Sequence, residues 1–93
     1  MNTGARLAGR YFIVFSLPNS IGKPRLGVTV SKKVSRHAVQ RNKVKRIIRE
    51  AFRLNQLMLS SIDVVVIAKP QSALQENIEL RQDLDKLWIK LGT

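Results

Sequence analysis

A group of cations with helical spacing is the part of this chain best suited to chemistry. When residues 38–59 are placed on a helix at about 100° per residue, cations and one amide fall on a single arc. The arc holds Arg41, Asn42, Lys45, Arg46, Arg49 and Arg53. Arginine forks bind phosphate oxygens in pairs, and an asparagine amide adds a donor and an acceptor. The arc therefore predicts a surface that binds a polyanion.

The charge of the whole chain favours the same interpretation. Its 93 residues hold 17 Lys and Arg against 6 Asp and Glu, a net charge of +11. The excess lies in residues 1–53, whose only acid is Glu50. A solvated helix surface is the alternative, but such surfaces usually carry acids four residues from their cations. A membrane-surface helix is a weaker alternative, because the apolar stripe at 44–52 is needed to cover a sheet. Nucleic acid is thus the expected partner class.

Side-chain catalysis finds little support. The chain has no Cys, which excludes disulfides, thiolate nucleophiles and zinc knuckles. Its one histidine, His37, has no evident partner of the kind that a general base needs. Most acids fall at 76–85, where i,i+4 pairing with cations explains them. No catalytic and no metal-ligating residue is predicted, and a stand-alone nuclease is disfavoured.

The elements that must position these residues follow from periodicity. We expect strands at 10–17, 25–31 and 63–69, helices at about 38–59 and 74–91, and a turn region at 18–24. The first two strands are expected to form a hairpin, and strand 63–69 to be interior and covered on both faces. A helix between two strands forms a βαβ unit, so one strand pair is expected to be parallel, with a right-handed crossover on general statistics.

These elements predict one domain over residues 1–93. The fold class is an α/β two-layer sandwich (α+β by another convention), with a small mixed sheet of about three to four strands packed by two helices. The longest apolar run, 64–68, is too short to span a membrane, and no export signal follows Met1. A cytoplasmic location is expected.

The first strand carries several aromatic residues whose role the spacing leaves open. Tyr11, Ile13 and Phe15 share one face, and Phe12 and Val14 share the other. Spacing alone favours all five as core. The alternative is that one set, beside Thr29 and Ser31, stacks on unpaired bases.

Several strings together resemble the protein subunit of bacterial ribonuclease P. They are RYFIVF at 10–15, SKK at 31–33, RNKVKRIIREAFR at 41–53 and DVVVIAKP at 63–70. The family's RNR motif is matched by Arg41 and Asn42, with Lys43 in the third place. The likeness covers about residues 6–91.

The resemblance implies a non-catalytic subunit of an endoribonuclease. In that ribonucleoprotein the RNA subunit performs the hydrolysis, holds most of the Mg²⁺, and removes the 5′ leader of precursor tRNA. The expected partners are ribonuclease P RNA and the leader, with no membrane and no obligate protein partner. The implied fold is like a ribosomal-protein domain, with a left-handed βαβ crossover. A generic basic ribosomal or RNA-chaperone domain, without a role in tRNA processing, is the alternative.

The resemblance also implies roles for individual residues. Catalytic RNA is expected to contact the helix at Arg41, Asn42, Lys43, Lys45, Arg46, Arg49 and Arg53. A cleft between the sheet face and this helix is expected to hold the leader, at Phe15, Thr29, Ser31, Lys32 and Lys33. Phe12 and Val14 are then core.

Two departures from the family pattern stand out. Lys43 replaces an arginine, so a bidentate fork becomes a point charge. The family's Arg-rich N-terminal helix, whose aromatic residues wall the cleft, is expected to be absent here.

Overall fold

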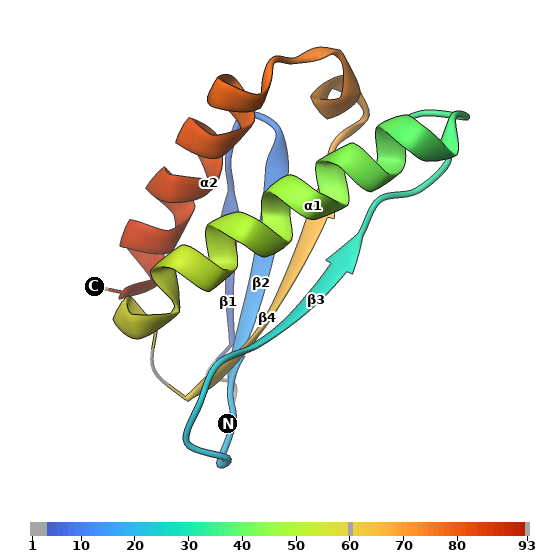
Figure 1. Ribbon diagram of the computed structural model, residues 1–93. Coiled ribbons are helices and arrows are strands. Elements are labelled where there is room, and N and C mark those ends of the chain that lie inside the picture. Colours follow the sequence, from blue (N-terminus) through green and yellow to red (C-terminus); the bar gives the residue numbers. More distant parts are fainter. Residues whose placement is uncertain (1–3, 60, 93) are drawn as a thin grey trace.

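The fold is a four-stranded mixed sheet with two long helices on one face (Figure 1). The computed structural model describes residues 4–59 and 61–92. The strands are β1 (Ala5–Ala8), β2 (Phe12–Pro18), β3 (Arg25–Thr29) and β4 (Ile62–Ala68). The helices are α1 (Ala38–Asn55) and α2 (Asn77–Gly92), with short 3₁₀ turns η1 (Gln56–Met58) and η2 (Pro70–Leu74). The predicted fold class is confirmed.

The order of strands across the sheet is β1-β2-β4-β3. β4 lies between β2 and β3, antiparallel to the first and parallel to the second. The expected hairpin between the first two predicted strands is therefore wrong. The hairpin partner of β2 is instead β1, whose sequence ARLA shows no periodicity.

The parallel pair of the βαβ unit is β3 and β4, joined through α1. In Figure 1 both strands run upward, α1 lies in front of the sheet, and β4 is to the left of β3. The chain therefore leaves β3, crosses the near face of the sheet through α1, and enters β4 on the left of β3, which makes the crossover left-handed. The right-handed expectation from general statistics is thus wrong, and the expectation from the resemblance is confirmed.

The core fills the space between the sheet and the two helices. From the sheet it takes Phe12, Val14, Val64 and Val66. From α1 it takes Val44, Ile47, Ile48 and Ala51, and from α2 Leu80, Leu84, Leu87 and Trp88. The rings of Phe52 and Trp88 pack in a T-shaped arrangement, with centroids 6.1 Å apart. The predicted apolar stripe at 44–52 is confirmed.

The opposite face of the sheet carries no helix within the described residues. Val65, at the middle of β4, is 40% exposed, and its neighbour Ile67 is half-buried. The sequence placed β4 correctly inside the sheet, but the prediction that both its faces are covered is wrong. A short apolar run indicates burial within a sheet without telling whether one face or both are covered.

No helix within residues 4–59 and 61–92 combines the length and the apolar character that a membrane span requires.

Candidate nucleic-acid interface

The outer face of α1 presents the predicted cations. Asn42, Arg46, Arg49 and Arg53 are exposed, and Lys45 is half-buried. The face arises because Val44, Ile47, Ile48 and Ala51 turn toward the sheet and leave the opposite arc in water. Arg46, Arg49 and Arg53 line one hollow of about 390 Å³ together with Glu50. Three guanidinium groups against one carboxylate give this hollow a net positive charge.

The two other residues of the predicted helix site bond within the protein. Nη1 of Arg41 donates to the carbonyl oxygens of Ser35 and Arg36, at 2.9 and 3.0 Å. Nζ of Lys43 donates to the carbonyl oxygen of Gln75 at 3.5 Å. Arg41 therefore fixes the connector that enters α1, and Lys43 joins α1 to the segment before α2. Binding of RNA by these two residues stays a prediction.

The open face of the sheet forms a second surface. The register places Phe15 beside Val65, and Val65 beside Gly27. Gly27 has no side chain, so the sheet is flat at this point. The exposed side chain of Val65 lies beside this flat strip, and Phe15, which is 40% exposed, lies next to Val65. In the next row Ile13, Ile67 and Thr29 are neighbours. An exposed phenyl ring on a flat apolar strip is suited to stacking with an unpaired base.

Arg6 also belongs to this surface, although no motif in the sequence marks it. Its position on β1 pairs with Phe15, and its guanidinium carbon lies 5.9 Å from the centre of the Phe15 ring. The two residues line a hollow of about 300 Å³ at the edge of the sheet. A cation over an exposed ring places a phosphate-binding group beside a stacking group. Nothing in the ARLA segment signals this pairing, because it depends on the β1–β2 register.

Ser31, Lys32 and Lys33 lie beyond the end of β3, on the connector to α1, and all three are exposed. The carbonyl of Ser31 accepts from the N–H of Val34 at 3.0 Å, and its hydroxyl accepts from the N–H of Lys33 at 3.2 Å. This turn follows the edge strand β3, so both lysines lie within four residues of Thr29 along the chain.

The expected cleft between the sheet face and the basic helix is wrong for the described residues. α1 packs on the face of Phe12 and Val14, whereas Phe15 and Val65 lie on the other face. The period of two along β2 sends these neighbours to opposite sides. The predicted contacts therefore divide into two surfaces, the basic face of α1 and the open sheet face.

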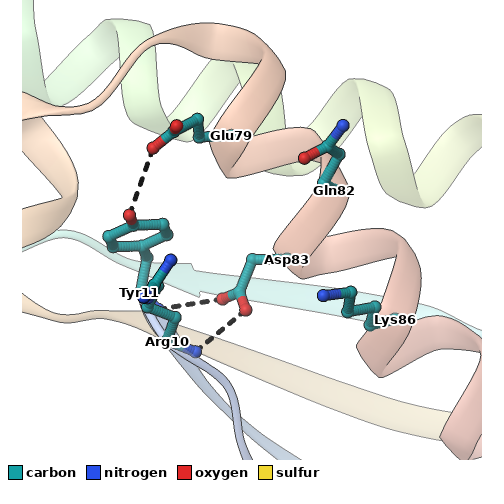
Figure 2. A pocket seen from close by; sticks show the side chains of 6 residues that line it. All are labelled: Arg10, Tyr11, Glu79, Gln82, Asp83 and Lys86. Carbon is teal, nitrogen blue, oxygen red and sulfur yellow. Dashed lines mark hydrogen bonds between the residues drawn. The ribbon is translucent and has the colours of Figure 1, made fainter.

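The strand pattern predicts Tyr11 on the same face as Phe15, and this prediction is wrong. Tyr11 precedes β2, is 7% exposed, and donates its hydroxyl to Glu79 Oε2 at 3.2 Å. Close by, Asp83 accepts from the backbone N–H groups of Arg10 and Tyr11 at 2.8 and 2.9 Å (Figure 2). These acids of α2 therefore hold the β1–β2 turn, and the expectation of i,i+4 pairing is wrong for them.

One carboxylate fixes the loop at the far end of the open face. Asp63 accepts two hydrogen bonds from Arg25, at 2.7 and 2.8 Å, and one from Asn19 Nδ2 at 2.9 Å. These bonds lower the pKa of Asp63 to about 2, and the same pair raises the pKa of Arg25. The side chain of Asn19 also accepts from Ser61 Oγ at 2.6 Å. Asn19, Arg25 and Asp63 thus join β2, β3 and β4 at one end.

Within the described part of the chain, no three His, Asp or Glu side chains cluster in a way that could hold a metal ion.

Comparison with known proteins identifies the family. The sequence profile of Ribonuclease P matches residues 1–92. The ribonuclease P protein component of Idiomarina loihiensis is 44% identical over 91 residues, which are 98% of this chain and 73% of that protein. That of Pseudomonas entomophila is 41% identical over 86 residues, covering 92% of this chain and 65% of the relative. The chain thus spans about two thirds to three quarters of these relatives' length.

Solved structures agree in fold. The RNase P protein of Staphylococcus aureus superposes with a TM-score of 0.86 at 36% identity, covering 94% of this chain and 81% of that one. The protein of Thermotoga maritima gives 0.83 at 31% identity, covering 95% and 84%. By sequence and by fold, the chain belongs to the ribonuclease P protein family.

Proposed function

We propose that this chain is the protein subunit of a ribonuclease P, in which it binds the catalytic RNA and the 5′ leader of precursor tRNA. Bound in this way, it promotes endonucleolytic removal of the leader, while the RNA performs the hydrolysis. Membership of the family supports the proposal. The observation that carries it is the pair of surfaces on opposite sides of one sheet, one basic and one flat and aromatic.

The basic face of α1 is assigned to the catalytic RNA. Arg46, Arg49 and Arg53 present forks that match phosphate oxygens, and their exposure allows contact with a folded RNA. A folded RNA offers a dense array of phosphates, so this contact is expected to weaken steeply with salt. Lys45 and Asn42 extend the same face.

The open sheet face is assigned to the leader. The leader is single-stranded, and its bases can stack on Phe15 while Arg6 and the lysines at 32 and 33 contact phosphates. Thr29 and Ser31 add hydroxyl groups at the edge of this face. Such a surface tolerates any base, because every base has a stacking face.

Mg²⁺ is assigned to the RNA subunit, and no step of the proposed function passes through a metal held by the protein. The contribution of the protein is electrostatic and positional. It neutralises phosphate charge that would otherwise repel the substrate, and it fixes the leader relative to the RNA. The place of action is proposed to be the cytoplasm.

The test is cleavage of precursor tRNA by a bacterial ribonuclease P RNA at low Mg²⁺, with and without this chain. The proposal predicts that the chain stimulates cleavage and that product formation needs the RNA subunit. Tight, salt-sensitive RNA binding without stimulation would instead support a generic basic RNA-binding domain. A Lys86→Gln variant, which removes one cation away from both surfaces, serves as the control for net charge.

A further inference from the structure

The groove between α1 and α2 has the features of an anion site. It has a volume of about 380 Å³ and is lined by Arg46, Ile47, Glu50, Asn77 and Arg81. Arg46 and Glu50 also line the hollow on the outer face of α1, so the two cavities adjoin. The basic surface of α1 therefore continues across the groove to α2.

The walls of this groove are held in place at both ends. Toward the start of α1, Lys43 donates to the carbonyl of Gln75, which lies just before α2. Toward the ends of the helices, the rings of Phe52 and Trp88 pack in a T-shaped arrangement. Between these two contacts, Ile47 is buried and forms the floor. The groove thus exists before any ligand enters, so a ligand would lose little free energy in ordering it.

Arg81 is the cation that α2 contributes to the groove. Its side chain is 31% exposed, and its Nε lies 3.8 Å from Asp85 Oδ1, which is beyond hydrogen-bond distance. Nε is buried and has no hydrogen-bond partner within the described residues. Asp85 Oδ1 is likewise buried and without a hydrogen-bond partner, so this carboxylate is the group that faces Nε, and a ligand in the groove would meet the exposed part of the Arg81 side chain instead.

Two of the neighbouring acids bond away from the groove. Asp83 is bonded to the backbone of Arg10 and Tyr11, and Glu79 to the Tyr11 hydroxyl, on the side of α2 that faces the β1–β2 turn. Asp85 is ion-paired with Arg81 at 3.8 Å on a partly exposed surface, so part of the charge of Arg81 is offset. Glu50 is the one carboxylate among the residues that line the groove, against two guanidinium groups.

We propose that a phosphodiester group of the catalytic RNA binds in the α1–α2 groove, held jointly by Arg46 and Arg81. This inference rests on the proposed function and extends it to a residue of α2. Two guanidinium forks can share the oxygens of one phosphate, and the amide of Asn77 can donate to the same group. The RNA footprint then bridges both helices instead of following α1 alone.

The test compares affinities for a labelled ribonuclease P RNA at fixed salt. The variants are Arg46→Gln, Arg81→Gln, the double variant, and Lys86→Gln as a matched loss of one cation from α2. Arg46→Gln and Arg81→Gln should each weaken binding about tenfold, as expected for a charged hydrogen-bonding contact. Because both arginines hold one phosphate, the double variant should bind about as weakly as either single variant. Lys86→Gln should differ little from the wild type.

When the wild type binds the RNA, three outcomes would overturn the proposal. In the first, Arg81→Gln binds the RNA as tightly as Lys86→Gln does. In the second, the affinity losses of Arg46→Gln and Arg81→Gln multiply in the double variant, which would show that the two arginines act at independent sites. Arg81→Lys keeps the charge and the aliphatic stem and removes only the guanidinium fork. Equal losses in Arg81→Gln and Arg81→Lys, with lowered melting temperatures, would assign the effect to the fold. Partial recovery with Lys supports the proposal.

The proposed function can fail separately from the groove. If wild type and Lys86→Gln both fail to bind the RNA, the proposed function and the groove are both overturned. If wild type binds and Arg46→Gln alone weakens binding, only the groove assignment is overturned. A further measurement adds inorganic phosphate to the RNA-binding assay at constant ionic strength. Competition with RNA by phosphate in wild type, but not in Arg81→Gln, supports a phosphate site.

Discussion

Phe12 and Phe15 lie three residues apart on β2 and face opposite sides of the sheet. Phe12 is fully buried beneath the helices, whereas Phe15 is 40% exposed on the open face. Their separation by an odd number of residues produces this division, because side chains alternate along a strand. Two similar rings therefore have different tasks: one stabilises the fold and the other is available to a ligand.

Replacement of each phenylalanine by alanine should separate these tasks. Phe12→Ala removes a fully buried ring and should lower the free energy of unfolding by about 3–5 kcal/mol. Phe15→Ala should change stability little but weaken binding of single-stranded RNA by about 1–3 kcal/mol, the usual contribution of one stacked base. Denaturant unfolding and fluorescence anisotropy measure the two effects. Similar behaviour of the two variants would show that the faces are assigned wrongly.

The basic face of α1 should contribute to RNA affinity and little to stability. Arg46→Ala and Arg49→Ala should each weaken binding of ribonuclease P RNA and reduce the slope of log K against log salt by about one. Phe52→Ala should instead cost about 3 kcal/mol in stability, because the ring packs against Trp88. Salt titrations of binding and thermal unfolding provide the two readouts. An unchanged salt slope in both arginine variants would contradict the assignment.

Asp83 and Gly9 should show coupled effects on stability. A Cβ on Gly9 would lie 2.6 Å from one carboxylate oxygen of Asp83 and 2.7 Å from the other. Gly9→Ala should therefore displace Asp83 and break its bonds to the β1–β2 turn, at a cost of about 1–3 kcal/mol. Asp83→Ala should cost a similar amount. In the Asp83→Ala background the cost of Gly9→Ala should nearly vanish, which a double-mutant cycle on unfolding free energies measures. Additive costs would refute the coupling.

Asp63 should make stability fall in acid. Its pKa in the folded protein is lowered to about 2, chiefly by the hydrogen bonds from Arg25 and then by that from Asn19. The unfolded pKa is near 3.9, so the stabilisation is complete above about pH 5 and is lost as the pH falls toward 2. Asp63→Asn should remove this part of the dependence of melting temperature on pH. Identical profiles for wild type and Asp63→Asn between pH 5 and 2 would contradict the contribution of this pair.

The sequence predicted those elements whose side chains repeat with a clear period. The apolar stripe of Val44, Ile47, Ile48 and Ala51 located α1 and its basic face, and the β-branched run at 64–67 located β4. β1 was missed because its four residues carry no alternation and gain their structure from pairing with β2. The order of the strands also escaped prediction, since the insertion of β4 between β2 and β3 is a non-local pairing.

The sequence predicts the residue types of the candidate site better than it predicts their arrangement in space. Arg46, Arg49 and Arg53 are exposed on α1 as the pattern predicts, and Phe15 is exposed on the sheet, but not in a cleft beside α1 as the resemblance implies. The division into two opposite surfaces was not predicted, because helix periodicity does not reveal which face of a sheet the helix covers. No local sequence pattern marks Arg6 or Arg81. Arg6 reaches its place through the register of β1 on β2, and Arg81 through the packing of α2 on α1.

The central claim is that the open sheet face binds the leader while α1 binds the catalytic RNA. The most direct measurement is the affinity of the assembled ribonucleoprotein for precursor tRNA and for mature tRNA, with wild type and with Phe15→Ala. The account predicts that Phe15→Ala weakens binding of precursor tRNA, leaves binding of mature tRNA unchanged, and leaves assembly with the RNA subunit intact. Equal affinities of wild type and Phe15→Ala for precursor tRNA, or equal losses for both substrates, would contradict it.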